Sequence, residues 1–225
     1  MLSALLRSCH QYGPVKAARK ALAALALGIA LAAPAASAEP VTVVALGDSL
    51  TAGFGLPQGE GLVPQLQRWL DAQGAGPVEV INMGVSGDTS AGGRARLDWA
   101  LGRSADAVIL ELGANDMLRG VDPSETRANL GAILSVLAER SLPVLVTGMK
   151  SSANFGADYK AQFDAIYPDL AAEHGALLDP FFFEGLLNRP GMLQADGLHP
   201  SAEGVAVVVQ RIGPLVIELI ERARR

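Results

Sequence analysis

Cysteine is almost absent from this sequence. Among its 225 residues only Cys9 is a cysteine, and it lies in a segment that we expect to be removed. The rest of the chain therefore predicts no disulfide, no thiol nucleophile and no thiolate metal site, so burial of a hydrophobic core must stabilise the fold. Histidine is also scarce: His174 and His199 are the only two after residue 38, and they are too far apart in the chain to form a metal-ligand cluster. We expect neither a metal nor another cofactor.

The first 38 residues have the pattern of a secretory signal. Basic residues at 16, 19 and 20 precede an apolar run over 21–33, and the small residues Ala36-Ser37-Ala38 follow. A charged start, a short apolar run and a small-residue cleavage site are the three parts of such a signal. The run is shorter than the roughly 20 apolar residues that span a membrane. We expect cleavage after Ala38, export of a bacterial protein to the periplasm or the medium, and no stable membrane anchor afterwards.

Basic clusters are also missing from residues 39–225. Removing residues 1–38 takes away four basic and no acidic residues, which changes the formal net charge from −5 to −9. An acidic chain without a basic cluster disfavours binding to nucleic acid or to anionic membrane surfaces. No internal repeat, low-complexity tract or long linker divides this part, so it predicts one domain.

Short apolar runs rich in valine and isoleucine alternate with segments of helical periodicity. The runs that we interpret as strands are 41–46, 78–81, 107–112, 144–146 and, more weakly, 176–178. The segments that we interpret as helices are 62–73, 92–102, 124–140, 158–173 and 202–222, the last with a bend at Gly213-Pro214. Strands that are apolar on both faces and alternate with helices indicate a three-layer α/β/α sandwich around a mainly parallel five-stranded sheet.

Small, polar and titratable residues follow the predicted strands. "GDS" follows the first, "NMGVSGDTS" the second and "GANDMLRG" the third, while "DGLHP" comes after the fifth, beyond an aromatic stretch. In such a sheet, ligands bind beyond the carboxyl ends of the strands. These four loops are therefore expected to meet at one edge and to form the functional site.

Ser49 and His199 are the candidate reactive pair. Asp196 lies three residues before His199 in a turn, where its carboxylate can hold one ring nitrogen and leave the other to take a proton from a serine. The alternative is that Asp48 or Ser49 only caps a helix. His174, before a glycine at a predicted helix end, suits a structural role because a histidine there complements the helix dipole.

Acyl transfer also needs donors for the developing oxyanion. Gly87 offers a backbone N–H that can approach a ligand closely because it has no Cβ, and Asn115 offers a neutral side-chain amide. Each polar residue of these loops, Asp88, Asn115 and Asp116 included, has the helix cap as its alternative role. The combination of nucleophile, base, orienting acid and two donors on separate loops favours catalysis.

Together "GDSL", "SGDTS", "GAND" and "DGLHP" resemble, in order and spacing, the motifs of the SGNH hydrolases, also called the GDSL family. The resemblance covers nearly all of residues 39–225 and is closest to bacterial arylesterases and multifunctional thioesterases/lysophospholipases. It implies the flavodoxin-like SGNH hydrolase fold and a serine esterase acting on a small-molecule acyl ester or thioester without a cofactor. It also implies that Ser49 is the nucleophile, His199 the base and Asp196 the residue that orients it. The implied oxyanion donors are the N–H of Ser49, the N–H of Gly87 and the amide of Asn115.

Two positions depart from the family pattern. Ala114 stands where relatives often have a second glycine, and Met117 stands where they often have a smaller residue, which predicts a narrower or differently shaped acyl pocket. The candidate lining residues are Phe54, Met117, Met149 and Phe155.

Two other functions remain open. One is a carbohydrate O-acetylesterase of the same family. The other is a non-catalytic flavodoxin-like binding module, which is disfavoured because no G-x-G-x-x-G or Walker lysine loop follows the first strand. The absence of G-x-S-x-G disfavours the α/β-hydrolase fold.

Overall fold

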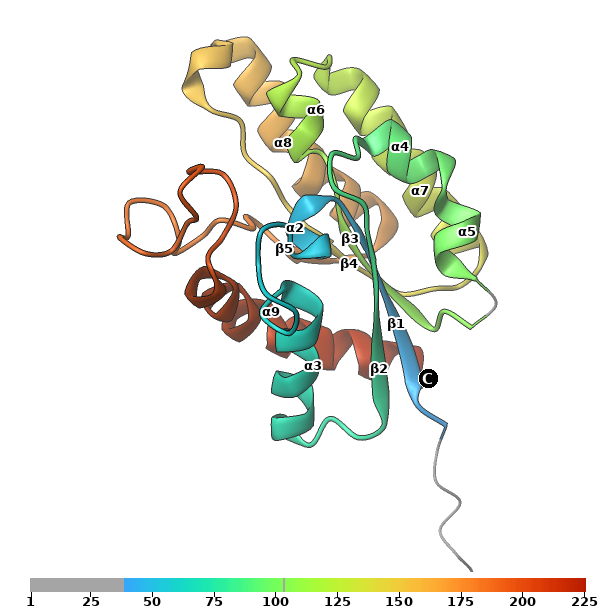
Figure 1. Ribbon diagram of the computed structural model, residues 1–225. Helices are drawn as coiled ribbons and strands as arrows, with labels where there is room; N and C mark the ends of the chain where they lie inside the picture. The colour runs from blue at the N-terminus through green and yellow to red at the C-terminus, as the bar shows by residue number, and fades with distance from the viewer. Residues whose placement is uncertain (1–38, 103) are drawn as a thin grey trace, which may run out of the picture. The chain divides into compact units, whose positions relative to one another are not determined.

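Five parallel strands form one sheet in the order β2-β1-β3-β4-β5 (Figure 1). The computed structural model describes residues 39–102 and 104–225, so the expected signal over residues 1–38 lies outside the described residues. The strands are β1 (Val41–Gly47), β2 (Val78–Gly84), β3 (Ala107–Glu111), β4 (Val144–Thr147) and β5 (Leu177–Asp179). This strand order is the flavodoxin-like one, in which the order of strand addition across the sheet reverses between β1 and β3. The structure thus confirms the predicted sheet.

Helices cover both faces of the sheet (Figure 1). One face carries α3 (Leu62–Gln73) and α9 (Ala202–Ala223). The other face carries α4 (Ser90–Ala95), α5 (Leu97–Leu101), α7 (Pro123–Glu139) and α8 (Ala157–His174). Three short helical turns, α2 (Ser49–Ala52), α6 (Ala114–Leu118) and η1 (Ala153–Phe155), follow strand ends or precede α8. This is the predicted three-layer α/β/α arrangement.

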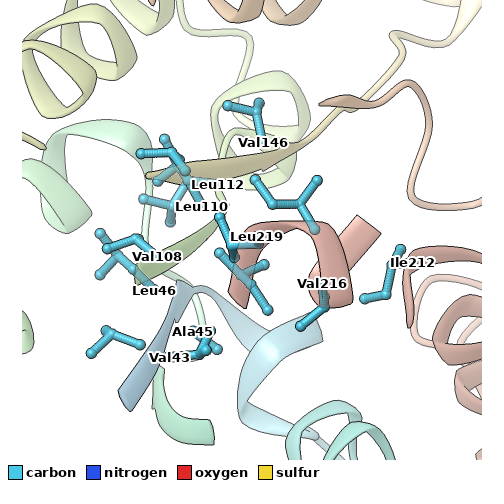
Figure 2. Close-up of a cluster of buried hydrophobic side chains, with 14 of the residues drawn as sticks. Val43, Ala45, Leu46, Val108, Leu110, Leu112, Val146, Ile212, Val216 and Leu219 are labelled. Atoms are coloured by element: carbon cyan, nitrogen blue, oxygen red, sulfur yellow. The ribbon is translucent and has the colours of Figure 1, made fainter. Parts of the chain in front are cut away.

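The central strands are buried along their whole length. Every residue of β1, β3 and β4 is buried, which explains why their sequences are continuous apolar runs rather than alternating ones. Figure 2 shows Val216 and Leu219 of α9 beside the side chains of β1 and β3. Each such aliphatic side chain contributes roughly 1.5–3 kcal/mol when it is removed from water. The core therefore holds the carboxyl ends of β1 and β3 in fixed positions.

One helical prediction differs from the structure. The segment 92–102 was expected to be one helix, but Arg96 separates α4 from α5. Its guanidinium reaches back to Asp88 (2.5 Å) and to the carbonyl oxygens of Met83 and Gly47 (both 2.8 Å). This tertiary contact, which local periodicity does not reveal, replaces the continuous helix.

The pair Gly213-Pro214 lies inside α9, which continues through it. A Cβ on residue 213 would lie 2.6 Å from ring atoms of Trp69, so glycine is required here for α9 to pack against α3. In this position the glycine is explained by helix packing.

Candidate active site

The hydroxyl of Ser49 lies at the carboxyl edge of the sheet, directly beyond β1. The preceding residue, Asp48, is the N-cap of α2, and its Oδ1 accepts a hydrogen bond from the N–H of Leu50 (3.0 Å). The capping role that was considered for both residues is therefore filled by Asp48. As the first residue of α2, Ser49 has its side chain available for other contacts.

His199 connects Ser49 to Asp196. Its Nε2 lies 2.9 Å from Ser49 Oγ, and its Nδ1 lies 2.6 Å from Asp196 Oδ2. The other oxygen of Asp196 accepts the backbone N–H groups of Leu198 (2.9 Å) and His199 (3.0 Å). These bonds, with that from the His199 backbone as the largest cause and that from its ring next, lower the pKa of Asp196 from 3.8 to about 2. An ionised carboxylate at this position orients the ring, as base catalysis requires.

Gln194 ties the histidine turn to the loop after α2. Its N–H donates to the carbonyl oxygen of His199 (2.8 Å), and its amide nitrogen donates to those of Phe54 (2.8 Å) and Pro200 (2.9 Å). The ring of Phe54, which is half exposed, lies on the ring of His199 with the centroids 4.7 Å apart. The imidazole is thus held from two sides. Sequence reasoning missed Gln194.

Two backbone N–H groups of the first two loops, those of Ser49 and Gly87, lack a hydrogen-bond partner within the described residues. No hydrogen bond runs from the N–H of Ser49 or of Gly87 to another residue of the described chain. Gly87 has φ +86°, a conformation that favours glycine, and its carbonyl oxygen accepts a bond from Arg119 (2.7 Å). Free N–H groups of this kind are suited to receive an oxyanion.

The amide of Asn115 lies between the first two loops. Its Nδ2 donates to Asp48 Oδ2 (2.9 Å) and to the carbonyl oxygen of Asp88 (2.9 Å). Asn115 is not the N-cap of α6, because Gly113 occupies that position. Its amide is instead held on the side of Ser49 by contacts with both neighbouring loops.

Two carboxyl groups are buried beneath these donors. Asp48 and Glu111 have no exposed surface, and Thr51 Oγ1 donates to Glu111 Oε2 (2.8 Å). Burial raises the pKa of Asp48 from 3.8 to about 6, and burial together with the charge of Asp48 raises that of Glu111 well above 4.5. Sequence reasoning missed Glu111, although the signal was present: an acid ends the apolar run "AVILE" just before "LGAND".

A cavity of about 320 Å³ opens beside Ser49 and His199, with Asn115 in its wall. Its lining is mostly apolar and includes Met117, Leu118, Met149, Phe181, Phe183 and Leu187. At its edge, the ammonium group of Lys150 lies 5.0 Å from the centre of the Phe181 ring. The cavity has room for an apolar group next to the serine hydroxyl.

Of the four residues expected to line this cavity, the structure places Met117 and Met149 in its wall. Phe54 instead covers His199, and Phe155 stacks on Tyr159 (5.2 Å between centroids), so neither lines this cavity. The aromatic side chains of the wall come from the stretch "PFFFEGLL" after β5, whose contribution no periodic pattern revealed.

Comparison with known proteins gives a consistent result. The sequence pattern of the GDSL-like Lipase/Acylhydrolase family matches residues 45–207. Esterase TesA of Pseudomonas aeruginosa is 36% identical over 195 residues, which cover 86% of this chain and 96% of that protein. Thioesterase 1/protease 1/lysophospholipase L1 of Escherichia coli K12 is 36% identical over 180 residues, covering 78% and 85%. The crystal structure of AlinE4, an SGNH-hydrolase family esterase, has a TM-score of 0.68 and 42% identity, over 80% of this chain and 96% of that one.

The chain belongs to the GDSL-like lipase/acylhydrolase family. The matched span of this family includes all the residues that the sequence assigned to the site: Ser49, Gly87, Asn115, Asp196 and His199. His174, by contrast, is the last residue of α8 and lines a second, smaller cavity with Arg222. Within the described ranges no helix is both long and apolar enough to span a membrane, and no group of three His, Cys, Asp or Glu residues could bind a metal.

Proposed function

We propose that this GDSL-family chain is a serine esterase that hydrolyses carboxylic esters through an acyl-enzyme intermediate, with Ser49 as nucleophile, His199 as base and Asp196 as the residue that orients the base. The observation that carries the proposal is the unbroken chain from Ser49 Oγ through both ring nitrogens of His199 to Asp196, with contacts of 2.9 and 2.6 Å. A nucleophile, a base and an orienting acid linked in this way are what acyl transfer requires.

Acylation begins as His199 Nε2 takes the proton of Ser49 Oγ and the oxygen forms a bond to the carbonyl carbon of the ester. The carbonyl oxygen becomes an oxyanion, which the N–H groups of Ser49 and Gly87 stabilise. The Asn115 amide joins them when one of its two N–H groups leaves the carbonyl oxygen of Asp88, because both are engaged in the free enzyme. When the tetrahedral intermediate collapses, the bond to the leaving oxygen breaks and His199 passes its proton to that oxygen. Water then attacks the acyl-serine with His199 again as base, which releases the carboxylic acid and restores Ser49.

The apolar cavity supports an acyl chain as the group that occupies it. Met117, Met149 and Phe183 offer no hydrogen bond to a sugar, so an acyl ester or thioester fits better than an acetylated glycan. We expect kcat/KM on p-nitrophenyl esters to rise with chain length until the cavity is full, and then to fall. Met117→Ala should move the optimum to a longer chain, because it enlarges the pocket. An optimum at acetate that Met117→Ala leaves unchanged would favour the O-acetylesterase alternative.

A variant without the Ser49 hydroxyl distinguishes the esterase from the alternative of a non-catalytic binding module. Ser49→Ala should abolish ester hydrolysis and leave the unfolding temperature close to that of the wild type, because a methyl group cannot attack a carbonyl. A fluorophosphonate should label Ser49 in the wild type, as mapped by mass spectrometry of tryptic peptides. Labelling at Ser86 or Ser90 would move the nucleophile to the second loop, and substantial turnover by the variant would refute the assignment.

We further propose that the protein is exported, on the basis of the signal-like pattern over residues 1–38. Cell fractionation with N-terminal sequencing of the mature protein tests this proposal. We expect a chain that begins at Glu39 outside the cytoplasm; an uncleaved cytoplasmic chain would contradict it.

A further inference from the structure

Asp48 and Glu111 form a buried carboxyl pair beneath the proposed oxyanion site. They come from the ends of neighbouring strands, since Gly47 of β1 is paired in register with Glu111 of β3. Both side chains are wholly buried, and within the described residues neither forms a salt bridge. Two adjacent buried charges without a counter-charge are very unfavourable. One of the two groups must therefore keep its proton.

The hydrogen bonds indicate which group keeps it. Both oxygens of Asp48 accept a bond, Oδ1 from Leu50 N (3.0 Å) and Oδ2 from Asn115 Nδ2 (2.9 Å), as an ionised carboxylate requires. In Glu111 only Oε2 accepts, from Thr51 Oγ1 (2.8 Å) and Asp48 N (3.2 Å), and Oε1 has no donor among the described residues. Among the four oxygens of the pair, Oε1 of Glu111 is the one without a donor in the described part of the chain, so a proton on this atom would give it the role of donor that the surroundings do not fill. Glu111 is the donor that fits.

The surrounding groups agree with this assignment. Arg96, a cation at this end of β1, donates to the carbonyl oxygen of Gly47 (2.8 Å) and to Asp88, which leaves Glu111 unneutralised. The other titratable groups whose charge acts on the pair are His199 and the buried Tyr167. Burial, together with the charge of Asp48, also raises the pKa of Glu111 well above its ordinary value.

We propose that Glu111 is a positioning residue: as a neutral acid it donates its proton to the carboxylate of Asp48, which in turn fixes Asn115 and the start of α2 at the oxyanion site. The proposal rests on the proposed function. The bond from Glu111 keeps the Asp48 carboxylate where it accepts the Asn115 amide. The pair then carries one negative charge instead of two. A second charge at this depth would repel the oxyanion that forms in the transition state.

The space around the pair is closed. A Cβ on residue 47 would lie 2.0 Å from Thr51 Oγ1 and 2.6 Å from Glu111 Oε2, so only glycine allows these groups to meet. Because β1 and β3 are fully buried here, the pair has little freedom to rearrange. A change at Glu111 should therefore be transmitted to Asp48 and Asn115.

Two variants of Glu111 test the positioning role by steady-state kinetics. Glu111→Gln keeps a neutral donor of similar size, and we expect its kcat to stay within about threefold of the wild type. Glu111→Leu removes the donor, and we expect kcat to fall about tenfold or more with KM nearly unchanged, because the oxyanion exists only in the transition state. An equal loss in both variants would show that an ionised carboxylate is needed and would overturn the proposal. So would an unchanged kcat in folded Glu111→Leu.

Infrared difference spectroscopy tests the proton directly and does not depend on esterase activity. At neutral pH, the wild type minus Glu111→Gln spectrum should contain the carbonyl band of a protonated carboxylic acid. The same band should appear when both proteins carry Ser49→Ala. Absence of the band would refute the neutral acid even if Ser49 proves to be the nucleophile. Its presence would support the neutral acid even if the esterase assignment failed.

Discussion

Asp48 precedes Ser49 in the chain and Asp196 reaches it through His199, and the surroundings of the two aspartates differ. Asp196 is in an exposed turn, accepts three hydrogen bonds from its own turn, and has a pKa lowered to about 2. Asp48 is wholly buried at a strand end beside a second carboxyl group, and burial raises its pKa to about 6. The same side chain thus serves as a permanent charge on the base side and as a shielded charge on the oxyanion side. What differs is access to water and to donors.

Replacing each aspartate by asparagine should give the largest difference in activity between the two sites. In Asp196→Asn the amide cannot hold the His199 tautomer that accepts a proton at Nε2, so we expect kcat to fall by about 10²–10⁴. In Asp48→Asn the new side chain still caps α2 and still offers one acceptor, so we expect a smaller loss of about tenfold. Initial rates on a p-nitrophenyl ester measure both. Similar losses in the two variants would mean that the carboxylates do not have the different roles described.

Variants of Asn115 test whether its amide, which contacts Asp48, stabilises the oxyanion. Asn115→Ala should lower kcat by about 10²–10³ with little change in KM, the usual result of losing one oxyanion donor. Asn115→Asp should be at least as harmful, because it places a carboxylate beside Asp48 and where the oxyanion forms. Full steady-state curves for both variants separate the two constants. If Asn115→Asp kept wild-type kcat while Asn115→Ala lost stability, Asn115 would be only structural.

The smallest expected effect is on stability, and it has opposite signs for the two aspartates. Asp48 binds its proton more tightly in the folded state than in the unfolded one, so its contribution falls as the pH rises from about 4 to 6. Asp48→Asn should therefore gain stability relative to the wild type over that range. Asp196 binds its proton less tightly when folded, so its contribution is present above about pH 4 and is lost as the pH falls toward 2.

Urea unfolding at a series of pH values measures this difference. As the pH rises from about 2 to 4, the free energy of unfolding of Asp196→Asn should fall relative to that of the wild type. As the pH rises from about 4 to 6, that of Asp48→Asn should increase relative to the wild type. Two flat differences would show that neither environment perturbs its aspartate.

The sequence was sufficient for the parts of the fold and site that repeat a local rule. The apolar runs predicted every strand, most clearly β1, β3 and β4, which are buried along their whole length. The loops after the strands predicted that Ser49 and His199 would come together. Contacts that no motif or periodic pattern marks were not predictable. The helix expected over 92–102 is interrupted at Arg96, because its guanidinium donates to the carbonyl oxygen of Gly47 and to Asp88.

The same limit applies within the site. The role of Gln194 depends on carbonyl oxygens that are distant in sequence, such as that of Phe54, and Phe181 lies in a loop without periodicity. Glu111 looked like the polar end of a strand, and only the register of β1 with β3 places it against Asp48. Phe155 was chosen for its type, but the neighbouring helix turn directs it toward Tyr159.

Ser49 and His199 are 150 residues apart in the chain, one directly after the first strand and the other in the turn before the last helix. A chain that has folded only its amino-terminal half holds the serine but has no base for it. Chemical reactivity therefore appears only when the last helix has docked, and the contact is of the long-range kind that forms slowly in folding. During synthesis and any passage through a membrane, the molecule would remain inert toward esters. The fraction of molecules that a fluorophosphonate labels, followed over time, would then report the fraction that has completed folding.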